Sequence, residues 1–274
     1  EKGTVVIRGN LALEFAFMTE GTMYTFAQPW KSGDKDFWMV NCFSGNSRYM
    51  VRAAKGTVRP EQKWSVSTAE YCRICLEPGN AGEYLATLEE NFEDWADRKI
   101  EYDYDAILKE KAAEFERFYE SMPSVPAVYA DAARVAAYVD WASIVAPCGV
   151  LKRESMFMSK NWMCNVWSWD HCFNAMALAY HNPKEAWDQF LVMFDFQKPS
   201  GNIPDSVNDA KIIHNYCKPP IHGWTLRKLM GIMAISHEQL MAAYEKLSKW
   251  TYWWLNCRDE NGDGLCEYTH GNEH

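Results

Sequence analysis

The N-terminal part of the chain alternates between apolar and polar residues with a period near two. Turn sequences such as Ser32-Gly33-Asp34 and Ser44-Gly45-Asn46 interrupt the alternation. Because successive side chains of a strand point to opposite faces, this pattern predicts β-strands. Short strands at this spacing favour an antiparallel sandwich. The expected strands are residues 4–8, 11–17, 24–27, 37–43, 48–52 and 69–76.

After Asn80 the apolar residues recur with a period of about 3.6, which predicts helices. Asn182-Pro183 and Ser236 are typical helix starts. No repeat of about 34 or 40 residues is visible, so a ring of helical hairpins is favoured over a solenoid, with its loops meeting at one rim. The expected helices are residues 81–97, 104–121, a segment around 135–145, and residues 169–180, 184–196, 226–235 and 237–256.

This organisation predicts a multi-domain α and β protein. A partial β-sandwich domain is expected at residues 1–79 and a helical domain at residues 80–274. The net charge of −9 and the pI near 5.3 argue against nucleic acid or an anionic membrane as partner, because both require a basic face. No apolar run approaches the roughly 18 residues of a membrane span. The compartment, cytoplasmic or periplasmic, stays open.

The aromatic content points to the kind of ligand. The chain has 13 Trp and 14 Tyr, which favours a neutral, hydroxyl-rich ligand or a large interface, with an aromatic core as the ordinary alternative. Cys72 and Cys75 form the single Cys-x-x-Cys pair, so the nine cysteines are interpreted as buried free thiols rather than zinc ligands. The seven histidines are interpreted as ordinary residues. No phosphate-loop or dinucleotide fingerprint occurs, so no organic cofactor is predicted.

Aromatic rings and carboxylates are concentrated between residues 156 and 222. Trp167-Ser168-Trp169-Asp170 follows Phe157 and Trp162. Ring faces stack on the C–H face of a pyranose, and carboxylates accept hydrogen bonds from its hydroxyls. Asp170 would also suit a simple helix cap, but a cap needs no aromatic wall. The stretch therefore predicts a sugar-binding site.

Two later loops add polar groups to this site. The first is Gly201-Asn202-Ile203-Pro204-Asp205, a turn sequence in which Asp205 alone would more often be a solvated carboxylate. The second is Lys218-Pro219-Pro220, whose prolines hold the backbone extended and so present Lys218 rigidly. A plain helix-entry loop is the alternative for the second segment.

Residues 259–267 resemble the first part of a calcium loop. Counted from Asp259 as the first position of the loop, side chains with oxygen atoms occupy positions 1, 3, 5 and 9. Glycine is at position 6, and a backbone carbonyl is available at position 7. His270 takes the place of the closing Glu, so a distant carboxylate would have to complete the shell, and a glycine-rich turn is the alternative. Ca²⁺ is the one cofactor predicted, with candidate ligands Asp259, Asn261, Asp263, Leu265 and Glu267.

Together these motifs resemble family 63 glycoside hydrolases, inverting α-glucosidases related to trehalases and mannosylglycerate hydrolases. The resemblance covers residues 80–274 and implies roughly the first half of an (α/α)6 barrel, preceded by the end of the family's N-terminal sandwich. It implies that Trp169 and Asp170 line the subsite for the cleaved sugar, and that Asp205 and Lys218 contact its hydroxyls. The matching segments, in the same order, are residues 167–171, 201–205, 218–220 and 258–268.

The resemblance also implies where the catalytic groups lie. Inversion needs a carboxylic acid and a carboxylate base about 6.5–9.5 Å apart. In the family the acid belongs to a Glu-x-Gly-x-Asp segment, and residues 271–274 resemble its beginning. We therefore expect no catalytic residue within the chain, with the acid just after His274 and the base well beyond it. The remainder of the barrel is the expected partner, in the same or a separate chain.

The sequence thus predicts part of an inverting hydrolase that cleaves an α-glucosidic bond in an oligosaccharide or α-glucoside. The first alternative is a related barrel enzyme, such as a trehalase or a debranching-type hydrolase. The second is a non-catalytic carbohydrate-binding or assembly fragment that keeps the sugar-binding residues and lacks the acid.

Overall fold

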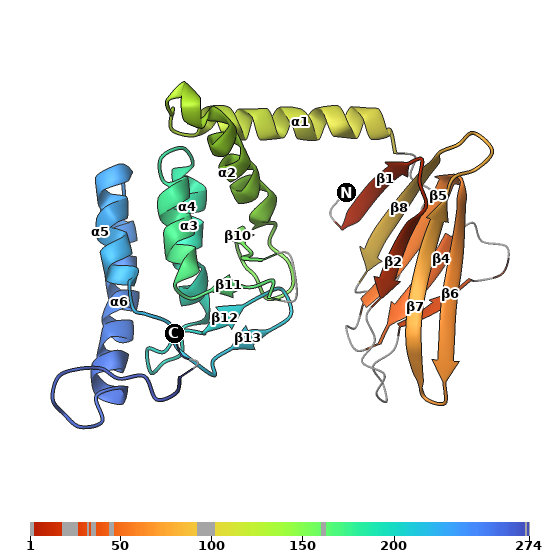
Figure 1. Cartoon of the computed structure of the whole chain (residues 1–274). Helices are drawn as coiled ribbons and strands as arrows, with labels where there is room; N and C mark the ends of the chain where they lie inside the picture. Colours follow the sequence, from red (N-terminus) through yellow and green to blue (C-terminus); the bar gives the residue numbers. More distant parts are fainter. Residues whose placement is uncertain are drawn as a thin grey trace. The chain divides into compact units, whose positions relative to one another are not determined.

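The computed structural model describes residues 3–17, 27–31, 33, 37–43, 47–91, 102–159, 163–271 and 273. The chain divides into two compact units, Glu1–Lys111 and Ala112–His274. The first is largely antiparallel β-structure and the second largely helical, as Figure 1 shows. The predicted order, a β region followed by helices, is confirmed.

The β unit contains two antiparallel sheets. One has the strand order β1-β8-β5-β4-β3 and the other β2-β7-β6. The first sheet consists of β1 (Thr4–Gly9), β8 (Tyr84–Asn91), β5 (Ser47–Lys55), β4 (Phe37–Cys42) and β3 (Ala27–Trp30). The second consists of β2 (Leu13–Phe17), β7 (Thr68–Glu77) and β6 (Thr57–Ser65).

The side-chain alternation packs these sheets face to face. Val40 and Val51 of the first sheet share one buried cluster with Ile74 and Leu76 of the second. Met39, the chain neighbour of Val40, belongs to a separate cluster because adjacent residues of a strand face opposite sides. A common core between two sheets is the arrangement of a sandwich.

The helix predicted at residues 81–97 is wrong over the described residues. Residues 84–91 form strand β8, which pairs with both β1 and β5. Tyr84, Ala86 and Leu88 alternate toward the sandwich core, so the same apolar residues fit a strand as well as a helix. Pairing with β1 and β5 selects the strand, because without β8 both strands would have unpaired backbone groups along one edge. The β unit therefore extends past the predicted domain limit at residue 79. Residues 92–101 lie outside the described part, as do residues 24–26 of the strand expected at 24–27.

The remaining helices confirm the predicted pattern, and the two helix starts predicted from sequence have the expected caps. Asn182 accepts a hydrogen bond from the backbone N–H of Glu185, with Pro183 in the first turn. Ser236 and Gln239 form a capping box. The helices are α1 (Tyr104–Ser121), α2 (Ala130–Ser143), α3 (Asp170–Leu178), α4 (Pro183–Leu191), α5 (His222–Ile232) and α6 (His237–Cys257), with short 3₁₀ turns at Ala127–Tyr129 and Val192–Phe196.

Short strands connect the helices of the second unit. β11 (Val166–Trp167), β12 (Ser206–Val207) and β13 (Ile212–Ile213) form a three-stranded sheet, and β9 (Ile144–Val145) pairs with β10 (Ser155–Met156). The three-stranded sheet lies where α3 and α5 begin (Figure 1). No helix in the described part of the chain is long and apolar enough to cross a bilayer.

Candidate functional site

Strand pairing brings the Trp-Asp motif next to the later Asp205 loop. Trp167 pairs with Ser206 between β11 and β12. The backbone N–H of Ser168 donates to the carbonyl of Asp205 at 3.0 Å, and the N–H of Asp205 donates to that of Ile213 at 2.8 Å. The predicted sugar-binding motifs thus share one small sheet.

Lys218 joins this sheet as a buried cation. Its Nζ lies 3.5 Å from Oδ1 of Asp205 and 5.4 Å from the centre of the Trp167 ring. The Lys218 and Asp205 side chains are 12% and 6% exposed. Burial raises the pKa of Asp205, although the charge of Lys218 acts in the opposite direction. Apart from this long contact with Lys218, Oδ1 of Asp205 has no hydrogen-bond partner, so the oxygen can still accept from a ligand hydroxyl.

Asp170 is the first residue of α3, next to this pair. Burial raises its pKa, while its own backbone N–H and the charge of Lys218 lower it. Lys218 therefore acts electrostatically on both Asp170 and Asp205. The structure brings together Trp167, Asp170, Asp205 and Lys218, which the sequence places in three separate segments.

An aromatic row continues from Trp169 along α3 to α5. The rings of Trp169 and Phe173 are 5.8 Å apart, and those of Phe173 and Trp224 are 6.2 Å apart. Phe173 and Trp224 are 46% and 47% exposed, so their faces are accessible. Sequence reasoning missed Phe173, although its position four residues after Trp169 on a helix could have indicated it.

Phe157 lies apart from this row. It is partly buried against the helical core, and its backbone N–H donates to Ser143 at 3.0 Å. The next residue, Met158, pairs with Asn165 just before β11. The predicted contact of Phe157 with sugar stays a prediction. Trp162 lies outside the described residues.

The loop predicted to bind calcium is folded around its own carboxylates. Asp259 accepts the backbone N–H groups of Asp263 and Gly264 at 3.1 and 3.0 Å. Nδ2 of Asn261 lies 3.2 Å from Asp263 and 3.0 Å from Glu267. An amide donor thus lies between the two carboxylates, although oxygen ligands are the type that Ca²⁺ takes. Calcium binding by this loop stays a prediction.

A buried ion pair beyond the loop was missed by sequence reasoning. Both terminal nitrogens of Arg258 donate to Glu273 at 2.9 Å, and the N–H of Thr269 donates to it at 2.7 Å. Burial raises the pKa of Glu273, but these hydrogen bonds more than offset it and lower the pKa to about 2. The thiol of Cys217 also contacts Glu273 at 3.7 Å. The pair therefore joins the end of α6 to the chain next to Lys218.

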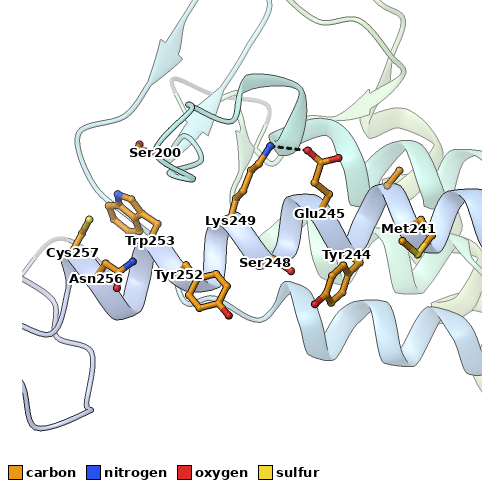
Figure 2. A pocket seen from close by; sticks show the side chains of 11 residues that line it. Ser200, Met241, Tyr244, Glu245, Ser248, Lys249, Tyr252, Trp253, Asn256 and Cys257 are labelled. Atoms are coloured by element: carbon orange, nitrogen blue, oxygen red, sulfur yellow. Dashed lines mark hydrogen bonds and ion pairs between the residues drawn. The ribbon is translucent and has the colours of Figure 1, made fainter.

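A separate hollow of about 750 Å³ runs along α6. Figure 2 shows Met241, Tyr244 and Tyr252 along it, with an ion pair between Lys249 and Glu245 at 2.8 Å. Tyr244 and Tyr252 are 67% and 62% exposed. None of the predicted sugar-binding residues lines this hollow.

Comparison with known proteins bears on the region that holds these motifs. Residues 163–274 match the family model of the mannosylglycerate hydrolase MGH1-like glycoside hydrolase domain. The matched region includes the converging residues described above and the Asp259–Glu267 loop. It indicates a carbohydrate-active domain of the glycoside hydrolase type. The more specific family 63 resemblance stays a prediction.

A similar fold occurs among solved structures. One of these structures is described as "Putative kojibiose phosphorylase from human microbiome", with a TM-score of 0.54 and 9% sequence identity. The similarity covers 90% of this chain and 40% of that chain, so this chain spans less than half the length of the similar protein. At this identity the likeness shows the fold, a β region followed by helices, and nothing of the reaction.

Proposed function

We propose that this chain supplies the sugar-binding part of an inverting glycoside hydrolase acting on an α-glucosidic bond. The observation that carries the proposal is the convergence of Trp167, Asp170, Asp205 and Lys218 inside the region that matches a glycoside hydrolase domain. The substrate would be an oligosaccharide or an α-glucoside.

Each group has a distinct task in this proposal. The half-exposed rings of Phe173 and Trp224 offer faces on which pyranose C–H groups stack, continuing from Trp169. The two carboxylates accept hydrogen bonds from sugar hydroxyls, and Lys218 donates. Because Lys218 pairs with Asp205, that carboxylate suits binding better than proton donation. Holding the pyranose rigidly lowers the entropic part of the barrier to bond cleavage.

The general acid and base would come from further segments of an (α/α)6 barrel, of which this chain forms roughly the first half. The exposed hollow along α6 is the kind of face that the next helical hairpin of a barrel covers. Ca²⁺, held by the Asp259–Glu267 loop, would stiffen the connection from α6 to Glu273.

Replacing Asp170 tests the proposal. In the complete enzyme, Asp170→Asn should lower kcat/KM for aryl α-glucosides on the order of 100-fold or more, because the sugar loses an oriented acceptor. NMR of the first product formed should show the β-anomer, as inversion requires.

Asp131→Asn is the matched control, since Asp131 is an exposed carboxylate in the first turn of α2. Equal losses of kcat/KM in the two variants would mean that Asp170 only stabilises the N-terminus of its helix. Absence of turnover, combined with quenching of tryptophan fluorescence by glucose, would favour the non-catalytic binding alternative.

A further inference from the structure

Three potential metal ligands meet beneath the candidate sugar site. His171 and Cys172 lie in the first turn of α3, and His222 is the first residue of α5. All three are 0% exposed, and one ligand atom from each lies within 4.8 Å of the others. The sugar-binding proposal uses none of these side chains.

The hydrogen bonds of His171 orient one nitrogen toward the cluster. Its Nδ1 lies 2.9 Å from the carbonyl oxygen of Trp167. A carbonyl can only accept, so Nδ1 carries the hydrogen and Nε2 carries the lone pair. Metal-binding histidines are commonly oriented by such a backbone contact.

The Sγ of Cys172 faces this lone pair at 3.7 Å. With metal–sulfur and metal–nitrogen bonds of about 2.3 and 2.0 Å, the sulfur and nitrogen stand about 3.5–3.8 Å apart at trigonal or tetrahedral angles. The observed separation is therefore already suitable for a shared ion. The ligand atom of His222 lies within 4.8 Å of the other two, so it would need to approach by at most about 1.5 Å.

His222 supplies the independent observation. Both of its ring nitrogens are buried, and the backbone of Ser168 can accept from one of them at most, so the other lacks a hydrogen-bond partner. Its ring packs against Phe194 at 5.4 Å and Trp250 at 6.0 Å, neither of which offers a strong acceptor. A buried, unsatisfied polar group costs roughly 1–3 kcal/mol, so a ligand for one of these nitrogens would remove a real penalty.

We propose that His171, Cys172 and His222 bind one Cu⁺ ion through two imidazole nitrogens and one thiolate. The Cys172 proton leaves to solvent as the Cu–S bond forms, and no electron is transferred. A three-coordinate His₂Cys set suits copper, whereas structural Zn²⁺ is almost always four-coordinate, and the described residues offer three ligands of this kind here. The complex carries no net charge, which suits a buried site.

Copper binding would link two segments of the candidate sugar site. Asp170 immediately precedes His171, and Lys218 precedes His222 by one short proline loop. An ion bridging the first turns of α3 and α5 would therefore hold the carboxylate and the lysine in register.

The test is a metal analysis with matched cysteine variants. Because the ligands are buried, copper is supplied during expression, and the purified, reduced protein is analysed for bound metal. We expect about one copper per chain in the unaltered protein and less than about a tenth of that in Cys172→Ser. X-ray absorption at the copper edge should show one sulfur and two nitrogen ligands.

Cys257→Ser and Cys72→Ser are the controls, removing an exposed and a buried thiol elsewhere. Both should retain the copper. The proposal is overturned by a copper-free protein, by equal copper in Cys172→Ser, or by ligation through sulfur alone. Retention of zinc in preference to copper, when both are supplied, also contradicts it. If Cys172→Ser does not fold, the ligand set of the unaltered protein decides.

Discussion

At the residue scale, the buried carboxylates differ in how many hydrogen-bond donors contact them. Burial raises the pKa of Asp170, Asp205 and Glu273 alike. Arg258 and Thr269 give Glu273 enough hydrogen bonds to reverse this, whereas Oδ1 of Asp205 has only the long contact with Lys218. The hydrogen bonds of Glu273 are thus satisfied within the protein, which suits a structural role. The two aspartates can still accept hydrogen bonds from a ligand.

Glu273 should make stability depend on acidic pH. Its pKa falls from 4.5 to about 2 on folding, so its contribution is fully present above about pH 4.5 and is lost as the pH falls toward 2. The shift corresponds to about 3 kcal/mol. The difference in free energy of unfolding between the unaltered protein and Glu273→Gln should therefore shrink between about pH 7 and pH 3, as urea titrations would measure.

Glu260→Gln serves as the control because Glu260 is exposed near the same loop. It should leave stability nearly unchanged at both pH values. A Glu273→Gln difference that stays constant with pH would mean that its effect is packing rather than ionisation.

At the element scale, one glycine sets how the Asp205 loop approaches α6. Gly201 has a φ of +100°, and a Cβ there would lie 2.1 Å from the carbonyl oxygen of Lys249. Gln197 reinforces the contact by donating to the carbonyls of Gly201 and Lys246, each at 2.9 Å. The turn residue predicted from sequence is therefore also a packing residue.

Gly201→Ala should destabilise the protein by roughly 2–4 kcal/mol, because it combines an unfavourable φ with a clash against helix backbone. Thermal unfolding would measure this as a clear drop in Tm. Gly231→Ala in α5 is the matched control, since nothing lies within 4 Å of its added Cβ. It should be neutral or stabilising by up to about 1 kcal/mol. Equal Tm values for the two variants would contradict the close approach.

At the scale of the whole molecule, calcium binding should couple to global unfolding. An ion that binds only the folded loop stabilises it by about 2.7 kcal/mol at a concentration 100-fold above Kd. We expect about 1 mM Ca²⁺ to raise Tm and a chelator to reverse the rise. Asp263→Asn should abolish the response and Glu260→Gln should keep it. A Tm insensitive to Ca²⁺ and chelator would remove this proposal.

The sequence by itself determined the features that depend on neighbours along the chain. Alternation predicted most of the strands, and the 3.6 period predicted the helices from α1 onward. The starts at Asn182 and Ser236 follow from side chains that cap their own backbone within three residues. Short-range hydrogen bonds and periodic burial leave such patterns in any chain that uses them.

The tertiary structure decided what depends on residues far apart in sequence. Residues 84–91 fit two periods, and pairing with β1 and β5 selected the strand. The contacts of Lys218 with Trp167 and Asp205, of Arg258 with Glu273, and of His222 with His171 have no fixed spacing to recognise. Chain folding sets these distances, because only packing brings the first turns of α3 and α5 together.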